Sequence, residues 1–216
     1  MFVLRKLLPV VLCAIGLSVV GGVQAEGVTA APTVVQSHLT EWELSELPRY
    51  PIGTYEGRPG ESLDAFLYQM RPVLRAYANK TRFEPCGELA KSGTGSDVRY
   101  GIVLASTHSH IGCLITTTNV PVGFTAMGIT YHAHGGTGSV IMSNADAVLL
   151  GYHGEGGGVR PTIAGQDVNA FSRTDFLTGA GYLATPTRVI YQDGNPRSVV
   201  VVPDTSTAAS VAVAGP

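Results

Sequence analysis

Charged residues are scarce in this chain. Only 14% of its 216 residues are charged, and 14 lysines and arginines stand against 16 acidic residues, which gives a formal net charge of −2. This balance excludes the strongly basic surface that marks nucleic-acid-binding proteins. The apolar share is 44%, which is too high for an intrinsically disordered chain. We therefore expect a folded domain with no nucleic-acid partner.

Common enzyme motifs are also missing. The sequence has no Walker or dinucleotide-binding fingerprint, and it has no G-x-S-x-G turn that could carry a nucleophilic serine. Zinc deaminases combine H-x-E with P-C-x-x-C, whereas the segment Pro85-Cys86-Gly87-Glu88 lacks the second cysteine. A thiol hydrolase built from Cys86 and His132 stays open as an alternative.

The first 25 residues have the pattern of a secretory signal peptide. Arg5 and Lys6 precede an apolar stretch from 7 to 20, and Val23-Gln24-Ala25 places small residues at the outer positions of a cleavage site. A membrane anchor is the alternative, but Pro9 interrupts the run, and a spanning helix needs about 20 apolar residues. We expect a periplasmic or secreted protein that is not an integral membrane protein after cleavage.

Cysteine is rare, and only Cys86 and Cys113 remain once the signal peptide is removed. In an oxidising compartment two such cysteines are more often bridged than free. We expect a disulfide that closes a loop of roughly 27 residues and stabilises the fold by about 3 kcal/mol.

The rest of the chain indicates one domain of mixed helix and strand with no internal repeat. Residues 26–60 contain four prolines and no sustained period, which predicts an extended N-terminal arm, and 204–216 predict a flexible tail. The domain at 61–203 begins with a helix capped by Ser62, which Pro72 is expected to kink or divide. Strands are expected at 83–90, 99–106, 113–118, 124–132, 183–192 and 198–202, with a long glycine-rich connection at 135–166.

Three short segments together supply the parts of a hydrolytic zinc site. They are Glu84-Pro85-Cys86-Gly87, His132-Ala133-His134 and Ser172-Arg173-Thr174-Asp175. Side chains alternate along a strand, so the two histidines share one face and can reach one metal ion. Catalytic zinc usually takes three protein ligands and leaves a position for water, from which a nearby glutamate can remove a proton.

The chain resembles the JAMM (JAB or MPN) zinc metalloprotease domain. The resemblance lies in the order of three motifs: Glu-x-Cys-Gly, then H-x-H at a strand end, then S-x-x-D at a helix start. The likeness covers about 62 to 202. The F-S-x-x-D motif at Phe171 and the stretch Gly181-Tyr182-Leu183-Ala184-Thr185-Pro186 are most similar to those of poorly characterised bacterial JAB-like domains. The resemblance implies an α/β (α+β) fold with a mixed sheet and flanking helices, similar to the cytidine-deaminase-like fold.

The resemblance also implies a role for each residue. His132, His134 and Asp175 would hold zinc. Glu84 would act as general base on the zinc-activated water, and Ser172 would hydrogen-bond the oxyanion. The reaction would be hydrolysis of a peptide or isopeptide bond. Because the signal peptide predicts export, a peptide or protein of the cell envelope is the expected substrate.

Two departures from the family pattern leave alternatives open. Gly135 stands where the family usually has proline, and the interval from His134 to Ser172 is longer than usual. Ser143-Asn144-Ala145-Asp146 lies nearly at the usual interval, so Asp146 is the alternative third ligand. With Asp175 as the ligand, the intervening segment would be a loop over the site that gates the substrate.

Two further alternatives concern metal binding and function. His108 and His110 have the same spacing as the second histidine pair, but their position between two expected strands predicts a hairpin turn. A catalytically inactive JAB-like binding module in the cell envelope is the alternative function.

Overall fold

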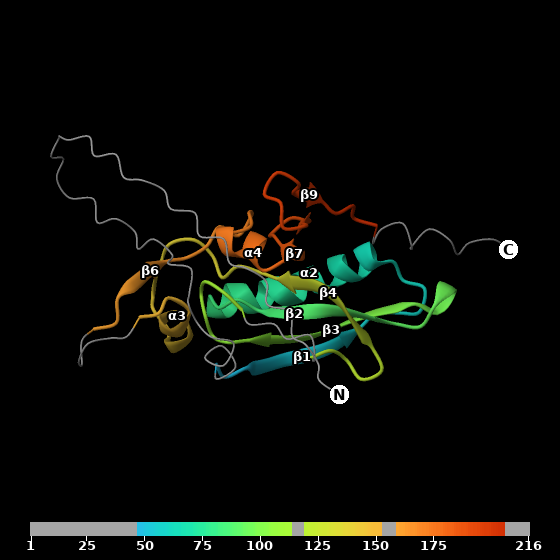
Figure 1. Ribbon diagram of the computed structural model, residues 1–216, viewed down its shortest axis with the longest axis horizontal. Coiled ribbons are helices and arrows are strands. Elements are labelled where there is room, and N and C mark those ends of the chain that lie inside the picture. The colour runs from blue at the N-terminus through green and yellow to red at the C-terminus, as the bar shows by residue number, and fades with distance from the viewer. Residues whose placement is uncertain (1–46, 114–118, 153–158, 206–216) are drawn as a thin grey trace, which may run out of the picture. The chain divides into compact units, whose positions relative to one another are not determined.

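The computed structural model describes residues 47–113, 119–152 and 159–205. They form a mixed α+β domain in which a seven-stranded sheet packs against the long helix α2 (Figure 1). The strand order is β1-β3-β2-β4-β7-β8-β9; β4 and β7 are parallel, and the other neighbours are antiparallel. The strands are β1 (Tyr50–Glu56), β2 (Cys86–Ser92), β3 (Arg99–Ser106), β4 (Thr125–His132), β7 (Gly181–Ala184), β8 (Val189–Gln192) and β9 (Val200–Val201).

Helix α2 (Leu63–Thr81) begins at the expected cap, because the Ser62 hydroxyl accepts a hydrogen bond from the Ala65 amide at 3.2 Å. Pro72 lies inside the helix, but all 19 residues form one element, so the proline does not divide it. The helix ends at Arg82, whose φ of 67° is left-handed and whose amide closes the last turn.

The buried face of α2 and the sheet share one hydrophobic core. Tyr131 of β4 is fully buried in it, and its hydroxyl donates to the Leu67 carbonyl at 2.9 Å, which ties β4 to α2. Because β4 carries the histidine pair at its end, this core fixes the strand that positions the candidate site. The core residues are Phe66, Leu67, Met70, Leu74, Ala78, Leu89, Ile102, Leu104, Tyr131, Ala133, Ala184, Val189 and Val202.

Strand β1 lies at one edge of the sheet, where the sequence predicted an extended arm. It pairs with β3 from Tyr50 opposite Ser106 to Glu56 opposite Gly101. The last part of the expected arm is therefore a strand of the domain. The predicted signal peptide, the earlier arm, most of the predicted tail and the strand expected at 113–118, apart from Cys113, lie outside the described residues.

The glycine-rich connection contains regular structure. Strands β5 (Ser139–Ile141) and β6 (Thr162–Ala164) form a small antiparallel sheet, and the helix α3 (Asn144–Leu149) lies between them in the chain. Residues 153–158 of this connection lie outside the described part. The segment expected to be a loop is thus, in good part, a small folded insertion.

The C-terminal strands form two consecutive hairpins. The single strand expected at 183–192 is in fact two, β7 and β8, which pair with each other. The hairpin predicted around residues 193–196 is confirmed by the pairing of β8 with β9. None of the helices that the structure describes is both long and apolar enough to cross a membrane.

Candidate metal centre

The end of β4 and the start of the helix α4 (Arg173–Leu177) bring the expected ligands together. His132 is the last residue of β4, between β2 and β7 in the sheet. His134 follows on the same side, and the two Nε2 atoms are 3.3 Å apart. Asp175 lies in the first turn of α4, with Oδ1 3.4 Å from His132 Nε2 and Oδ2 3.3 Å from His134 Nε2.

These spacings suit a tetrahedral metal site. Among the described residues, His132, His134 and Asp175 form the group of three potential ligands whose ligand atoms all lie within 4.8 Å of one another. Tetrahedral ligands at the usual zinc distance of about 2.05 Å are about 3.3 Å from each other, which agrees with the observed separations. Two imidazoles and one carboxylate are a donor set that accepts zinc and other divalent transition metals. The three residues are therefore able to bind a metal ion.

The ring of His134 is fixed by a partner behind it. Its Nδ1 lies 2.6 Å from the carbonyl oxygen of Asp167, and a carbonyl only accepts, so Nδ1 carries the proton and Nε2 faces the cluster as a ligand. The backbone carbonyl of His134 accepts a hydrogen bond from Arg75 of α2 at 2.8 Å. Neither partner was expected from the sequence: a backbone carbonyl leaves no sequence signal, and Arg75 was visible only as a charge among apolar helix positions.

Ser172 and Asp175 form the capping box of α4. The Asp175 carboxylate accepts hydrogen bonds from the Ser172 amide at 2.6 Å and the Ser172 hydroxyl at 2.8 Å. Burial by itself would raise the pKa of Asp175, but the neighbouring His132 and His134 hold it well below its usual range. The carboxylate is therefore ionised, as a metal ligand has to be.

Glu84 lies immediately before β2 and beside this cluster. Its amide donates to the Ser109 carbonyl at 2.9 Å, the residue is 2% exposed, and its Oε1 has no hydrogen-bond partner among the described residues. Burial raises the pKa of Glu84 to about 8; His134 opposes the rise, and Asp175 and Asp146 add to it. A buried carboxyl group that titrates near neutral pH suits a general base.

In the metal-free protein, Glu84→Gln should raise the free energy of unfolding in alkaline solution. The folded pKa of about 8 lies above the ordinary value of 4.5, so the folded state holds the extra proton and stability falls as the pH rises between these values. Glutamine does not ionise, so the free energy of unfolding of the variant does not fall in this way as the pH rises. We expect little difference near pH 4.5 and an advantage of a few kcal/mol near pH 8, measured by urea unfolding in the presence of a chelator.

Glu88→Gln is the matched control for that measurement. Glu88 is as buried as Glu84, but its Oε1 accepts a hydrogen bond from the Gly128 amide at 2.9 Å. An equal pH-dependent gain in the Glu88 variant would show that the effect does not come from the unpartnered carboxyl group of Glu84.

Asp146, the alternative third ligand, is not brought to the histidines of β4. It is fully buried and forms a second capping box, with Ser143, at the start of α3. Its Oδ1 accepts from the Ser109 hydroxyl at 2.6 Å and the His110 amide at 2.7 Å, while its Oδ2 lies 2.6 Å from His110 Nδ1. Both carboxylate oxygens are thus engaged elsewhere.

The second histidine pair forms no ligand cluster in the described part of the chain. His108 has a left-handed φ of 58° and stacks between the rings of Tyr50 and Phe83, at centroid distances of 3.6 and 4.8 Å. His110 is bonded to Asp146 instead. The two residues occupy the loop that follows β3, and both rings pack on Phe83.

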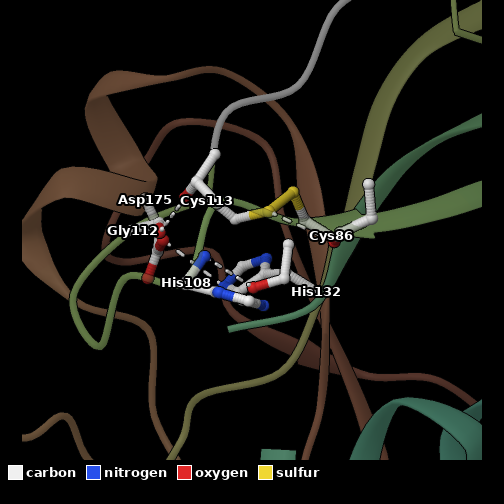
Figure 2. Close-up of a disulfide and its surroundings, with 9 residues drawn as sticks. Cys86, His108, Gly112, Cys113, His132 and Asp175 are labelled. Carbon is white, nitrogen blue, oxygen red and sulfur yellow. Dashed lines mark hydrogen bonds and ion pairs between the residues drawn. A yellow bond between two sulfur atoms is a disulfide. The ribbon is translucent and has the colours of Figure 1, made fainter. Parts of the chain in front are cut away.

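The expected disulfide between Cys86 and Cys113 is present. Figure 2 shows it beside His132, the residue that lies opposite Cys86 in the pairing of β2 with β4. The bridge links the strand that follows Glu84 to the loop that carries Ser109 and His110. It therefore holds two sides of the candidate site together.

The site combines residues from the segment before β2, the end of β4 and the first turn of α4, and the insertion contributes Asp146 at its edge. Chemically, this arrangement offers a metal-binding cluster beside a buried carboxyl group. No protein-family model matches the chain, and no curated protein or solved structure matches it either.

Proposed function

We propose that the protein is an exported zinc-dependent hydrolase of the JAMM type, which cleaves peptide or isopeptide bonds. The observation that carries the proposal is a buried carboxyl group, Glu84, without a hydrogen-bond partner for Oε1, next to three residues whose spacing is compatible with a zinc ion. An unpartnered buried carboxyl group is costly to the fold. Its position beside the cluster is understandable if it handles a proton there.

The chain's own residues would divide the chemistry as follows. His132, His134 and Asp175 would hold the metal, with His134 kept in the required tautomer by the Asp167 carbonyl. Zinc in this position supplies Lewis acidity, which favours ionisation of water and polarises a carbonyl group. Glu84 would accept a proton from the attacking water and return it to the leaving nitrogen, so that no net proton is gained or lost by the protein.

Ser172 would donate a hydrogen bond to the carbonyl oxygen of the scissile bond. Its hydroxyl now donates to the Asp175 carboxylate at 2.8 Å, so it lies directly beside a proposed metal ligand. A hydroxyl can rotate to a new acceptor, and a donor aimed at developing negative charge is the usual device for stabilising an oxyanion.

Assignment to the JAMM type rests on the order of the parts along the chain. The base precedes β2, the histidine pair ends β4, and the S-x-x-D motif opens α4. The parallel pairing of β4 with β7 and the flanking helix α2 are compatible with the mixed sheet expected for that fold.

An extracytoplasmic site of action is proposed from the disulfide and the signal-like N-terminus. Disulfides persist mainly in oxidising compartments, such as the periplasm and the extracellular space. A peptide cross-link or protein of the cell envelope is the substrate that such a location favours.

Metal binding tests the proposal through two matched variants. Asp175 and Asp146 are each the third residue of a helix and the last residue of an S-x-x-D capping box, but only Asp175 lies against the histidine pair. We expect the wild-type protein to bind one zinc ion per chain. Asp175→Asn should weaken zinc binding by more than about 100-fold, because loss of an outer partner alone costs 10- to 100-fold. Asp146→Asn should bind zinc nearly as the wild type does, as measured by chelator competition and elemental analysis.

Two results would contradict this function. A wild-type protein that takes up no zinc would favour the inactive binding module, and equal loss of zinc in both aspartate variants would remove Asp175 as the specific ligand. Circular dichroism of each variant separates loss of a ligand from loss of the fold.

A further inference from the structure

His110 is a buried histidine for which the proposed mechanism has no use. Its side chain is 10% exposed, and Nδ1 lies 2.6 Å from Oδ2 of the fully buried Asp146. Although burial opposes it, the hydrogen bonds from Ser109, His110 and Ser143 hold the pKa of Asp146 below its usual range. An ionised carboxylate only accepts, so Nδ1 of His110 carries the proton.

Among the described residues, the hydrogen bonds of His110 run through its amide and its Nδ1, both to Asp146, and none involves the other ring nitrogen, Nε2. In the neutral ring with a protonated Nδ1, Nε2 is an acceptor with a free lone pair. The pair is not part of a serine-hydrolase triad, because the Ser109 hydroxyl donates to Asp146 and not to His110. Asp146 thus fixes the orientation of the ring, and Nε2 is left able to accept a hydrogen bond.

The segment that carries the oriented imidazole is bonded to the segment that carries the proposed base. Glu84 donates its amide hydrogen to the carbonyl of Ser109, the residue before His110, at 2.9 Å. The ring of Phe83, the residue before Glu84, packs on the ring of His110 with centroids 4.6 Å apart. The His110 acceptor and the Glu84 carboxyl group therefore belong to neighbouring chain segments that are bonded to each other.

We propose that His110 accepts a hydrogen bond through Nε2 from a backbone N–H group of the bound peptide substrate, and that Asp146 is its positioning residue. The proposal rests on the proposed amide hydrolase and specifies its substrate class. The substrate would be a peptide chain with backbone amides next to the bond that is cleaved. This proposal gives the insertion a role, because its helix α3 carries Asp146, whose carboxylate orients His110. A fixed acceptor beside the base places an amide substrate without an ordering cost at each turnover.

His110→Asn is the decisive variant. Its side-chain amide can replace Nδ1–H as donor to Asp146, while the atom at the Nε2 position is lost. The probe is a quenched-fluorescent peptide selected from a mixed pool for cleavage by the zinc-loaded full-length protein. We expect KM to rise about 5- to 10-fold with little change in kcat, as for the loss of one hydrogen bond that the ground state and the transition state share. Zinc content should not change.

Binding without turnover gives a second readout. In the Glu84→Gln background, the same peptide should bind about 5- to 10-fold more weakly when His110→Asn is added. N-methylation of the backbone amide that His110 contacts should weaken peptide binding by the same factor in the Glu84→Gln protein that keeps His110. In the protein that also carries His110→Asn, the N-methyl group should not weaken binding further. His108→Asn is the control, because its ring stacks on Tyr50 and Phe83 and bonds neither Asp146 nor the proposed ligands.

The outcomes separate this proposal from the proposed function. If the wild-type protein cleaves a peptide and His110→Asn leaves KM and peptide affinity unchanged, His110 is not a substrate contact and the zinc hydrolase stands. Loss of zinc from His110→Asn would make His110 part of the metal site and overturn the proposal. If the zinc-loaded wild type neither cleaves nor binds any peptide in the pool, both proposals fail.

Discussion

Replacing Glu84 with glutamine is expected to lower the rate of amide hydrolysis by about 1,000-fold and to leave zinc binding intact, since a general base contributes roughly 100- to 10,000-fold. Glutamine has nearly the same size and fills the same buried position, but it cannot take a proton. Glu84 is not among the three clustered ligands, so the metal site keeps its donors. Steady-state hydrolysis of the pool-selected peptide, with zinc content measured on the same sample, tests both halves of the expectation.

Two comparisons sharpen this result. Glu88→Gln changes an equally buried glutamate of β2 whose carboxylate accepts from the Gly128 amide, and it should keep its activity. Asp175→Asn should lose zinc and activity together, whereas the Glu84 variant loses activity alone. Full activity in Glu84→Gln would remove Glu84 from the mechanism, even if the metal site is correct.

Local sequence patterns predicted much of the site, because local physics determines those parts. Ser62 caps its helix as expected and Ser172 caps the helix that its S-x-x-D motif opens, since a serine hydroxyl in the right place satisfies a free amide at a helix start. Strand alternation correctly placed His132 and His134 on one side. The disulfide followed from two cysteines in a chain with a signal-like start.

The two S-x-x-D motifs by themselves do not distinguish Asp175 from Asp146, and the sequence favoured Asp175 only through its flanking residues, Phe171 and 181–186, which resemble those of JAB-like domains. Ser143 with Asp146 and Ser172 with Asp175 both form complete capping boxes, so the motifs are equivalent within their own helices. What separates them is tertiary placement: α4 brings its aspartate to the histidines of β4, and α3 brings its aspartate to His110. Contacts between segments distant in sequence decide which aspartate lies beside the histidines, and the motif alone does not contain them.

Strand β1 was missed for a related reason. Four prolines, Pro51 among them, and the lack of a sustained period argued for an arm, but the strand lies at the sheet edge, where a missing amide donor is tolerated. The pairing with β3 shifts register between Pro51 and Gly53. Edge position is a property of the assembled sheet, and short stretches of sequence do not reveal it.

Replacing Gly135 with alanine should destabilise the fold and weaken zinc binding together. A Cβ atom at this position would lie 1.6 Å from the carbonyl oxygen and 2.4 Å from the carbonyl carbon of Arg82. Both are backbone atoms, so no side chain can rotate away, and one of the two segments has to move. Overpacking usually costs about 1 to 3 kcal/mol, and for a backbone clash we expect about 3 kcal/mol or more.

The same clash would exclude proline at this position, because proline carries the same Cβ. Gly135 directly follows the ligand His134, and Arg82 comes two residues before Glu84, so movement of either segment separates the proposed base from the proposed metal. Urea unfolding and zinc titration of Gly135→Ala should both show the loss. Gly112→Ala is the control, because its added Cβ would meet only the end of the Leu149 side chain, at 3.2 Å. If Gly135→Ala were as stable as Gly112→Ala and bound zinc equally well, the close approach of the two segments would not be what holds Glu84 beside the cluster.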